Sequence, residues 1–352
     1  MKLAVPRRHR SIALAYVLLL LLVLVGRVIA NGFLAVDHID ELIDTGALIG
    51  FVALGQGFVI LAGGVDLSIP WVVTASGILI SSFAGTNSSN MLWAVPLILG
   101  LSGLVGLING VGIVFLGVPA IIMTLGMYTT VEGVLLLYTN GNAGGNAPAA
   151  AVYLATHKWG QIPVMGVAWL VLIAVVTFTL SCTPFGRRLY AVGLSRRVAL
   201  FSGVNVRFET CAVYVISSVA AGFAGIALAG YVGESYLGMG DPYLFTSIAA
   251  VAIGGASILG GSGNYIGTVA GAMTLAVLDA VLPTLGFQPS VLDIVYGAVI
   301  LIAVAAASLG ARSRTRSIPN WLFVPWAARR RNPPGVEETM IPGGFKEPSL
   351  DD

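Results

Sequence analysis

Long apolar runs separated by short polar loops are the feature that most constrains the fold of this chain. About 20 apolar residues span the hydrocarbon core of a bilayer, and inside that core the chain must satisfy its backbone hydrogen bonds internally. Of the 352 residues, 57% are hydrophobic and only 10% are charged, whereas a soluble domain carries about 25% charged residues. We therefore predict an all-α, polytopic membrane protein embedded in the lipid bilayer.

About ten transmembrane helices are expected from these runs. The third and the eighth are short, and each borders a Gly-Gly break. The first run follows a short basic segment and so resembles a secretory signal, but it is long for one, and we interpret it as an uncleaved first helix. The expected spans are 11–30, 46–63, 70–85, 92–115, 119–139, 163–182, 208–232, 243–260, 265–286 and 290–309.

Lysine and arginine are concentrated in three segments, 1–10, 183–207 and 310–352. Together these hold 16 of the 18 basic residues. Positive residues collect in cytoplasmic loops, and an even number of spans places all three segments on one side. We predict cytoplasmic termini, with a basic N-terminus over 1–10, a transmembrane domain over 11–309, and a tail over 310–352 that is basic and interfacial and then disordered.

The segment 55–70 interrupts an apolar run with a double glycine, an acidic residue and a proline. A carboxylate and a flexible backbone are costly in lipid, so they are usually buried in protein or line a wet path. The simpler interpretation is a helix cap at a membrane surface. Because the topology puts this break and a later glycine-rich break on the cytoplasmic face, we predict a hinge near an inner gate. Its expected residues are Gly63, Gly64, Asp66, Ser68, Gly260 and Gly261.

Two loops carry helix signals of their own. In the basic loop 183–207, Ser195 can cap a short helix that runs to about Ser202, and Gly203 suits its end. In the outer loop, residues 149–156 also favour a short helix. Either loop can serve as a partner surface, although a connector and a topology signal are the simpler interpretations.

Three motifs resemble those of bacterial ABC-transporter permeases of the ribose/xylose/galactofuranose type. The basic loop matches the family's signature at Thr183 to Arg187, Tyr190 to Gly193 and Ser202-Gly203. The stretch Gly63 to Ser68 resembles the family's Gly-Gly-Ile-Asp-Leu-Ser element, and residues 254–263 resemble its late glycine-rich element. The resemblance covers nearly all of 11–309.

This resemblance implies the transmembrane subunit of an ATP-driven importer that moves a monosaccharide across the bacterial cytoplasmic (inner) membrane. Two permease chains, identical or related, would form the pathway. Two cytoplasmic ATPases would bind ATP and Mg, and an extracytoplasmic sugar-binding protein would deliver the substrate. The short helix of the basic loop would sit in a groove of the ATPase. The implied coupling residues are Gly186, Arg187, Tyr190, Gly193, Ser202 and Gly203.

Catalytic and nucleotide-binding motifs are absent from the sequence. A phosphate-binding P-loop needs a lysine after glycine, and none of Lys2, Lys158 and Lys346 follows one. The three histidines are scattered without the spacing of metal ligands. We therefore expect a transport subunit that is not an enzyme, binds no cofactor or metal itself, and does not bind nucleic acid.

One alternative from another class is an ion-coupled secondary transporter of a small polar solute. Such carriers also use broken helices and buried carboxylates. The residues that could couple an ion are Asp66, Glu132, Asp279 and Asp293.

Polar residues inside the spans are candidates for the substrate path. A neutral sugar needs groups that match hydroxyls and little charge. Each candidate could instead make only a hydrogen bond between helices. The candidates are Gln56, Ser76, Asn109, Thr124 and Tyr128, followed by Thr246 and Asn264.

Overall fold

The computed structural model describes residues 7–85, 87–142 and 144–315. Its contacts divide the chain into two units, residues 1–307 and 308–352, and the description below concerns the first. Helices dominate this unit, and the strands among the described residues are two or three residues long. The predicted all-α class is confirmed. The predicted tail beyond residue 315 and the first six residues lie outside the described residues.

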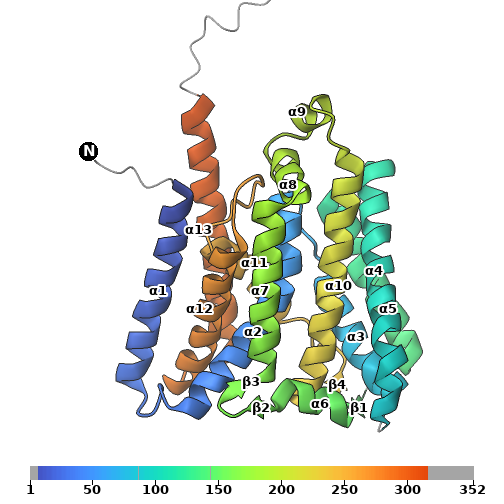
Figure 1. The fold of residues 1–352 in the computed structure, drawn as a ribbon, viewed down its shortest axis with the longest axis vertical. Helices are drawn as coiled ribbons and strands as arrows, with labels where there is room; N and C mark the ends of the chain where they lie inside the picture. The colour runs from blue at the N-terminus through green and yellow to red at the C-terminus, as the bar shows by residue number, and fades with distance from the viewer. Residues whose placement is uncertain (1–6, 86, 143, 316–352) are drawn as a thin grey trace, which may run out of the picture. The chain divides into compact units, whose positions relative to one another are not determined.

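Ten apolar helices in the described part of the chain correspond to the ten expected spans (Figure 1). Seven are long and apolar enough to cross a membrane, and α3, α11 and α13 provide shorter apolar stretches. The helices are α1 (Arg7–Ile29), α2 (Val36–Leu61), α3 (Ile69–Ala84), α4 (Met91–Phe115), α5 (Ala120–Thr139), α7 (Val164–Cys182), α10 (Val206–Val232), α11 (Tyr243–Ile253), α12 (Tyr265–Thr284) and α13 (Pro289–Thr315).

Two helix bounds differ most from the expected spans. Helix α2 begins at Val36, ten residues earlier than expected, because its acidic first turns remain helical. Helix α11 ends at Ile253 rather than near 260, since Gly254 begins a turn and Gly255 adopts a positive φ of 82°. The chain between α11 and α12 is therefore a loop of turns, and not the end of a helix.

Helix α2 forms the centre of the bundle. Its apolar stretch is 89% buried, compared with 61% for α12 and 56% for α10, whereas α1, α4, α5 and α7 are 11–22% buried. Around it pack α10, α11 and α12. The outer helices present exposed leucine, isoleucine and valine side chains, which is the surface that contact with lipid requires.

Small residues let the inner helices approach closely. A Cβ at Gly110 of α4 would lie 2.7 Å from the Cα of Cys211 in α10, and Gly106 faces the same helix one turn away. Similarly, Gly271 of α12 lies against the carbonyl of Ala250 in α11. These glycines pack helices, as small-xxx-small spacings do in membrane proteins.

The two ends of the bundle differ in structure (Figure 1). One end, termed the α9 end, carries α8 (Pro184–Leu194) and α9 (Arg196–Phe201). The opposite α6 end carries α6 (Ala149–Thr156), which confirms the helix expected there, and a short 3-10 turn, η1 (Ser88–Asn90). It also holds two antiparallel pairs: β1 (Gly144–Asn146) with β4 (Glu234–Tyr236), and β2 (Lys158–Trp159) with β3 (Ile162–Pro163).

The β2–β3 hairpin is attached to the start of α2 by an ion pair. The Lys158 Nζ lies 2.7 Å from the Asp40 Oδ2 and 3.5 Å from the Asp37 Oδ1. The hydrogen bond to Asp40 raises the pKa of Lys158 above its ordinary value. Asp40 is almost fully buried, and this ion pair gives its carboxylate a partner.

Candidate functional site

Three segments that are far apart in the sequence meet at the α9 end of α2. The amide of Gly261 donates a hydrogen bond to the carbonyl of Leu61, the last residue of α2, at 3.0 Å. Gly193 near the end of α8 lies against the same carbonyl and against Gly261. A Cβ at Gly260 would lie 2.8 Å from the Cα of Gly63. These four glycines, Gly63, Gly193, Gly260 and Gly261, are termed the glycine junction.

Backbone geometry requires glycine at three positions of the junction. Gly63, Gly260 and Gly261 have φ values of 78°, 91° and 73°, a region that residues with a Cβ rarely occupy. Gly193 is helical, and there the requirement is space. A side chain at Gly193, Gly260 or Gly261 would force apart the segments that meet here.

The junction brings together residues that the sequence analysis assigned to two separate groups. Gly193 and Tyr190 come from the expected coupling loop, and the other junction glycines come from the expected hinge. Tyr190 adds a second link, because its hydroxyl donates to the carbonyl of Gly263 at 2.9 Å. The surface helix α8 is thus joined directly to both glycine-rich breaks.

Asp66 lies inside the bundle, whereas its sequence context predicts a position at the cytoplasmic face of the membrane. Its side chain is 1% exposed. One carboxylate oxygen accepts from the amide of Ser68 at 3.0 Å and from its hydroxyl at 2.6 Å, and the other accepts from the hydroxyl of Ser217 at 2.7 Å. Asn109 donates to the hydroxyl of Ser68 at 2.9 Å. Asp66, Ser68, Asn109 and Ser217 are termed the Asp66 cluster.

The cluster joins α10 and α4 to the segment between α2 and α3. A hydrogen bond to a charged group contributes about 1.5–3 kcal/mol, so the three bonds to Asp66 offset much of the cost of burying it. The Asp66 bond to the Ser68 amide resembles the expected cap, but α3 begins at Ile69 with Ser68 itself in the N-cap position.

Several buried polar atoms around this cluster have no protein partner. They are the Oδ1 of Asn109, the hydroxyl of Tyr214, and both amide atoms of Gln56, whose neighbour Gly55 packs against Ser217. An unsatisfied buried group costs about 1–3 kcal/mol. Polar groups in this state gain partners from water or from a rearranged packing of the helices.

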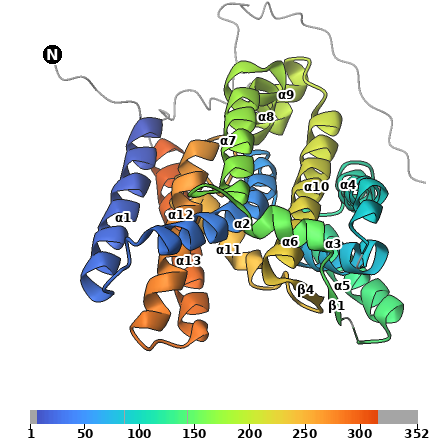
Figure 2. The ribbon, with the colours of Figure 1, turned by 60° about the horizontal axis from the view of Figure 1, so that its bottom comes forward.

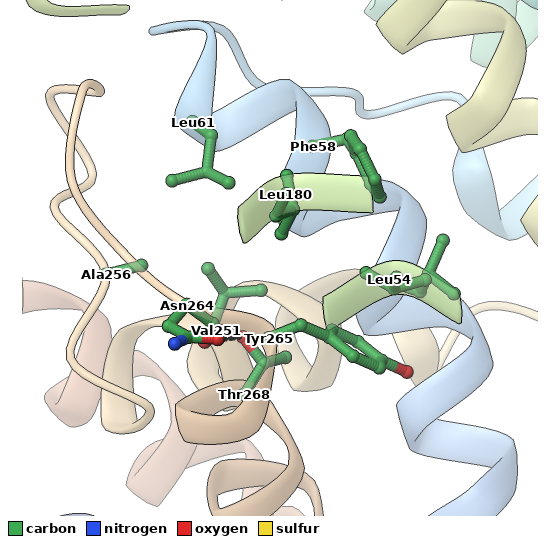
Figure 3. A pocket seen from close by; sticks show the side chains of 11 residues that line it. Leu54, Phe58, Leu61, Leu180, Val251, Ala256, Asn264, Tyr265 and Thr268 are labelled. Carbon is green, nitrogen blue, oxygen red and sulfur yellow. Dashed lines mark hydrogen bonds between the residues drawn. The ribbon is translucent and has the colours of Figure 1, made fainter. Parts of the chain in front are cut away.

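A very small cavity lies beside the junction, with a volume of about 10 Å³ (Figure 3). Phe58 and Leu61 of α2 line one side, and Asn264, Tyr265 and Thr268 at the start of α12 line the other. This volume holds about one water molecule. The bundle is therefore closed to solutes at this point.

The other expected path residues bond to protein groups, either in their own helix or in a neighbouring one. The hydroxyl of Ser76 lies 3.2 Å from that of Ser102 on α4, and Thr124 bonds to the carbonyl of Ala120 in its own helix. Tyr128 differs, since its hydroxyl lies 3.5 Å from a carboxylate oxygen of Asp241. Sequence reasoning missed Ser217, for which the only local signal was a serine pair in the middle of an apolar span.

Exposed apolar side chains gather on the short helices at the α9 end. Ser195 caps α9 by accepting from the amide of Val198, and Gly203 follows the helix with φ 79°, so the predicted short helix is confirmed. Helix α8, capped by Thr183, was not predicted. The apolar side chains Leu194, Val198, Leu200 and Phe201 are 62–78% exposed, and are termed the α9 surface. Arg196 and Arg197 lie beside them and are also exposed.

Residues 38–304 match the family described as the branched-chain amino acid transport system / permease component. The chain belongs to this permease family. The ribose import permease protein RbsC of Haemophilus influenzae is 30% identical to this permease over 296 residues, covering 83% of this chain and 91% of the relative. RbsC of Bacillus subtilis is 32% identical over 290 residues, covering 81% and 89%.

A second group of relatives is named for a different cargo. The autoinducer 2 import system permease protein LsrD of Yersinia enterocolitica is 30% identical over 292 residues, covering 81% of this permease and 85% of the relative. No solved structure matches the chain significantly. The resemblance inferred from the three motifs is confirmed: this is a multi-pass permease subunit of a bacterial ABC transporter, and it is not a catalytic subunit.

Proposed function

We propose that this permease is the transmembrane subunit of an importer that moves a monosaccharide into the cell. Cytoplasmic ATPases supply the energy, and a soluble binding protein delivers the sugar from outside. The observation that carries the proposal is the glycine junction, because it connects the α9 surface to both breaks in the bundle. An importer needs such a connection between the ATPase and the transport path.

The α9 surface fits an ATPase groove in its chemistry and its position. Its apolar side chains are exposed beyond the bundle, where lipid does not cover them, and the flanking arginines suit an acidic groove rim. When the bound ATPases bind ATP and Mg and close, α8 and α9 move. Gly193 and Tyr190 carry that movement to the end of α2 and to the loop before α12. The unsatisfied polar atoms around Asp66 can gain partners when the packing there rearranges.

The orientation follows from the charges at the two ends. Five arginines of 183–207 lie at the α9 end, whereas Asp37, Asp40, Glu41 and Glu234 lie at the α6 end. The α9 end is cytoplasmic by the positive-inside rule. Ten spans, two of them short and next to the glycine breaks, then leave both termini in the cytoplasm of a bacterial cell. The α6 end receives the binding protein, and a second permease chain, identical or related, completes the pathway.

Two cargo classes agree with the relatives. Ribose is named for RbsC and autoinducer 2 for LsrD, and both groups are about equally similar to this chain. The three motifs favour a monosaccharide, and autoinducer 2 is the second candidate. The family membership supports ATP-driven import over the ion-coupled alternative.

The proposal is tested by uptake in cells that express the permease with its ATPase and binding protein. Radiolabelled D-ribose, D-xylose, D-galactose and autoinducer 2 serve as probes. We expect uptake of one of the sugars that requires the binding protein and an ATPase with an intact ATP site. Uptake that continues with an inactive ATPase and collapses with the ion gradient would contradict the proposal.

A further inference from the structure

A large cavity lies at the α6 end, between α2, α10, α11, α12 and α13, which are neighbours in Figure 2. Its volume of about 710 Å³ is within the range of about 300–1,000 Å³ that small-molecule sites occupy. Its lining residues lie in the second half of α12, in the first turns of α13, near the middle of α2, late in α10, in α11 and on the chain that leads into α11. It is thus far from the glycine junction.

The chemistry of the lining is specific. Three aspartates and three tyrosines contribute to it, together with two threonines and several apolar side chains, and none of the lining residues is a lysine, arginine or histidine. The acidic and aromatic members are Asp241, Asp279, Asp293, Tyr236, Tyr243 and Tyr296. An anionic solute would be repelled here. Carboxylates accept hydrogen bonds from hydroxyl groups, and tyrosine rings offer apolar faces to carbon-bound hydrogens.

Contacts with the rest of the bundle fix the position of two side chains in the cavity wall. The side chains of Tyr296 and Thr246 are 95% buried, and the hydroxyl of Thr246 bonds to the carbonyl of Pro242 at 2.7 Å. The three aspartates themselves are exposed, so a solute can reach their carboxyl groups. Fixed aromatic walls and accessible acceptors are the arrangement of a binding site.

The cavity also contacts the expected path. Tyr128 of α5 lies 3.5 Å from Asp241, and Asp279 and Asp293, which the sequence suggested as ion-coupling residues, line one cavity instead of separate sites. The cavity at this end has about 710 Å³, whereas the one beside the junction has about 10 Å³.

We propose that this cavity is a binding site for an uncharged, hydroxyl-rich solute, with Asp241, Asp279 and Asp293 as hydrogen-bond acceptors. The site accepts a free sugar as it leaves the binding protein and excludes phosphorylated and carboxylated solutes. This inference rests on the proposed importer function.

The first experiment measures uptake by the complete transporter with radiolabelled D-ribose, D-xylose and D-galactose. The double variant Asp279→Asn/Asp293→Asn keeps the shape of both side chains and removes their charge. We expect uptake to fall about tenfold or more, as the loss of charge-assisted hydrogen bonds implies, with unchanged amounts of permease in the membrane and of co-purified ATPase. The control Glu234→Gln changes an exposed carboxylate outside the cavity and should transport normally.

A second measurement does not depend on transport by the double variant. In a chain with Cys182→Ser and Cys211→Ser, the variant Tyr236→Cys, at a lining position that is 46% exposed, is labelled with a membrane-impermeant thiol reagent. The sugar that the wild type transports should slow the labelling, and D-ribose 5-phosphate and spermidine should not. Protection by the phosphate or the polyamine, or none by the transported sugar, overturns the inference. If the wild type transports none of the three sugars, the proposed function fails instead.

Discussion

At the scale of single residues, Asp66 shows how a carboxylate can be structural in an apolar bundle. Replacing it with alanine removes the acceptor of three hydrogen bonds and leaves the buried hydroxyl of Ser217 without one. We expect Asp66→Ala to lower the free energy of unfolding by about 1–3 kcal/mol or more, measured by thermal unfolding of the purified protein in detergent. The control Glu234→Ala changes an exposed carboxylate outside the bundle core. Equal shifts for the two variants would show that the cluster adds no stability.

Gly203 is the residue whose replacement separates coupling from folding. Its φ is 79° and a Cβ there would meet no atom within 4 Å, so a valine strains only the turn after α9, by about 1–2 kcal/mol. We expect Gly203→Val to reduce uptake while the permease still reaches the membrane. Gly160→Val, at φ 67° and equally open but at the α6 end, is the matched control. Normal uptake with normal ATP turnover in the first variant would exclude a coupling role.

Local signals allowed some residues to be predicted and not others. Ser195 and Gly203 could be placed because a cap depends only on its neighbours in sequence. The partner of Asp66 could not, because Ser217 follows it by 151 residues and no local pattern joins them. The contacts of the glycine junction could not be predicted for the same reason. Each glycine stands out in the sequence, but their contacts depend on how three distant segments pack.

At the scale of elements, α8 presents Arg187 to solvent on the proposed ATPase side. We expect Arg187→Ala to reduce co-purification of the ATPase more than it reduces binding-protein-dependent recognition of the sugar. Arg27→Ala removes another exposed arginine, at the α6 end of α1, and should leave the ATPase bound. Undiminished co-purification with Arg187→Ala would contradict a contact at this helix.

The β2–β3 hairpin should make stability depend on pH in the alkaline range. The pKa of Lys158 is raised above 10.5 in the folded protein, so its contribution is fully present below that value and is lost as the pH rises through the raised pKa. We expect Lys158→Met to melt below the wild type at neutral pH, and the difference to shrink in strongly alkaline buffer. The effect is modest because the ammonium is partly exposed. A difference that stays constant with pH would show that the ion pair does not stabilise the fold.

Elements that follow from the hydropathy of neighbouring residues were predicted, and elements that depend on contacts between distant segments were not. The ten apolar helices and α6 follow from composition and caps. Helix α8 was missed because we interpreted its arginines only as a topology signal. Its buried side is formed by Leu189 and Val192. The β1–β4 pair was missed because its strands, three residues each and about 90 residues apart, carry no strand pattern.

At the scale of the whole molecule, the proposed orientation has a direct test. In a chain with Cys182→Ser and Cys211→Ser, single cysteines are placed at Gly160 and at Ser202. We expect a membrane-impermeant maleimide added to intact cells to label the first and not the second, and to label both after permeabilisation. The reverse pattern would place the α9 end outside the cell and exclude an ATPase there.

The glycines of the junction are far apart in the sequence, so the junction forms late in the synthesis of the permease. Gly63 leaves the ribosome about 200 residues before Gly261, which at about 5–20 residues per second is a delay of about 10–40 s. Until then the polar groups around Asp66 lie in a bundle that lacks α11 and α12. A nascent chain halted before the late glycine-rich loop is therefore inserted in the membrane but still unable to form its junction, and is a natural target for membrane quality-control proteases.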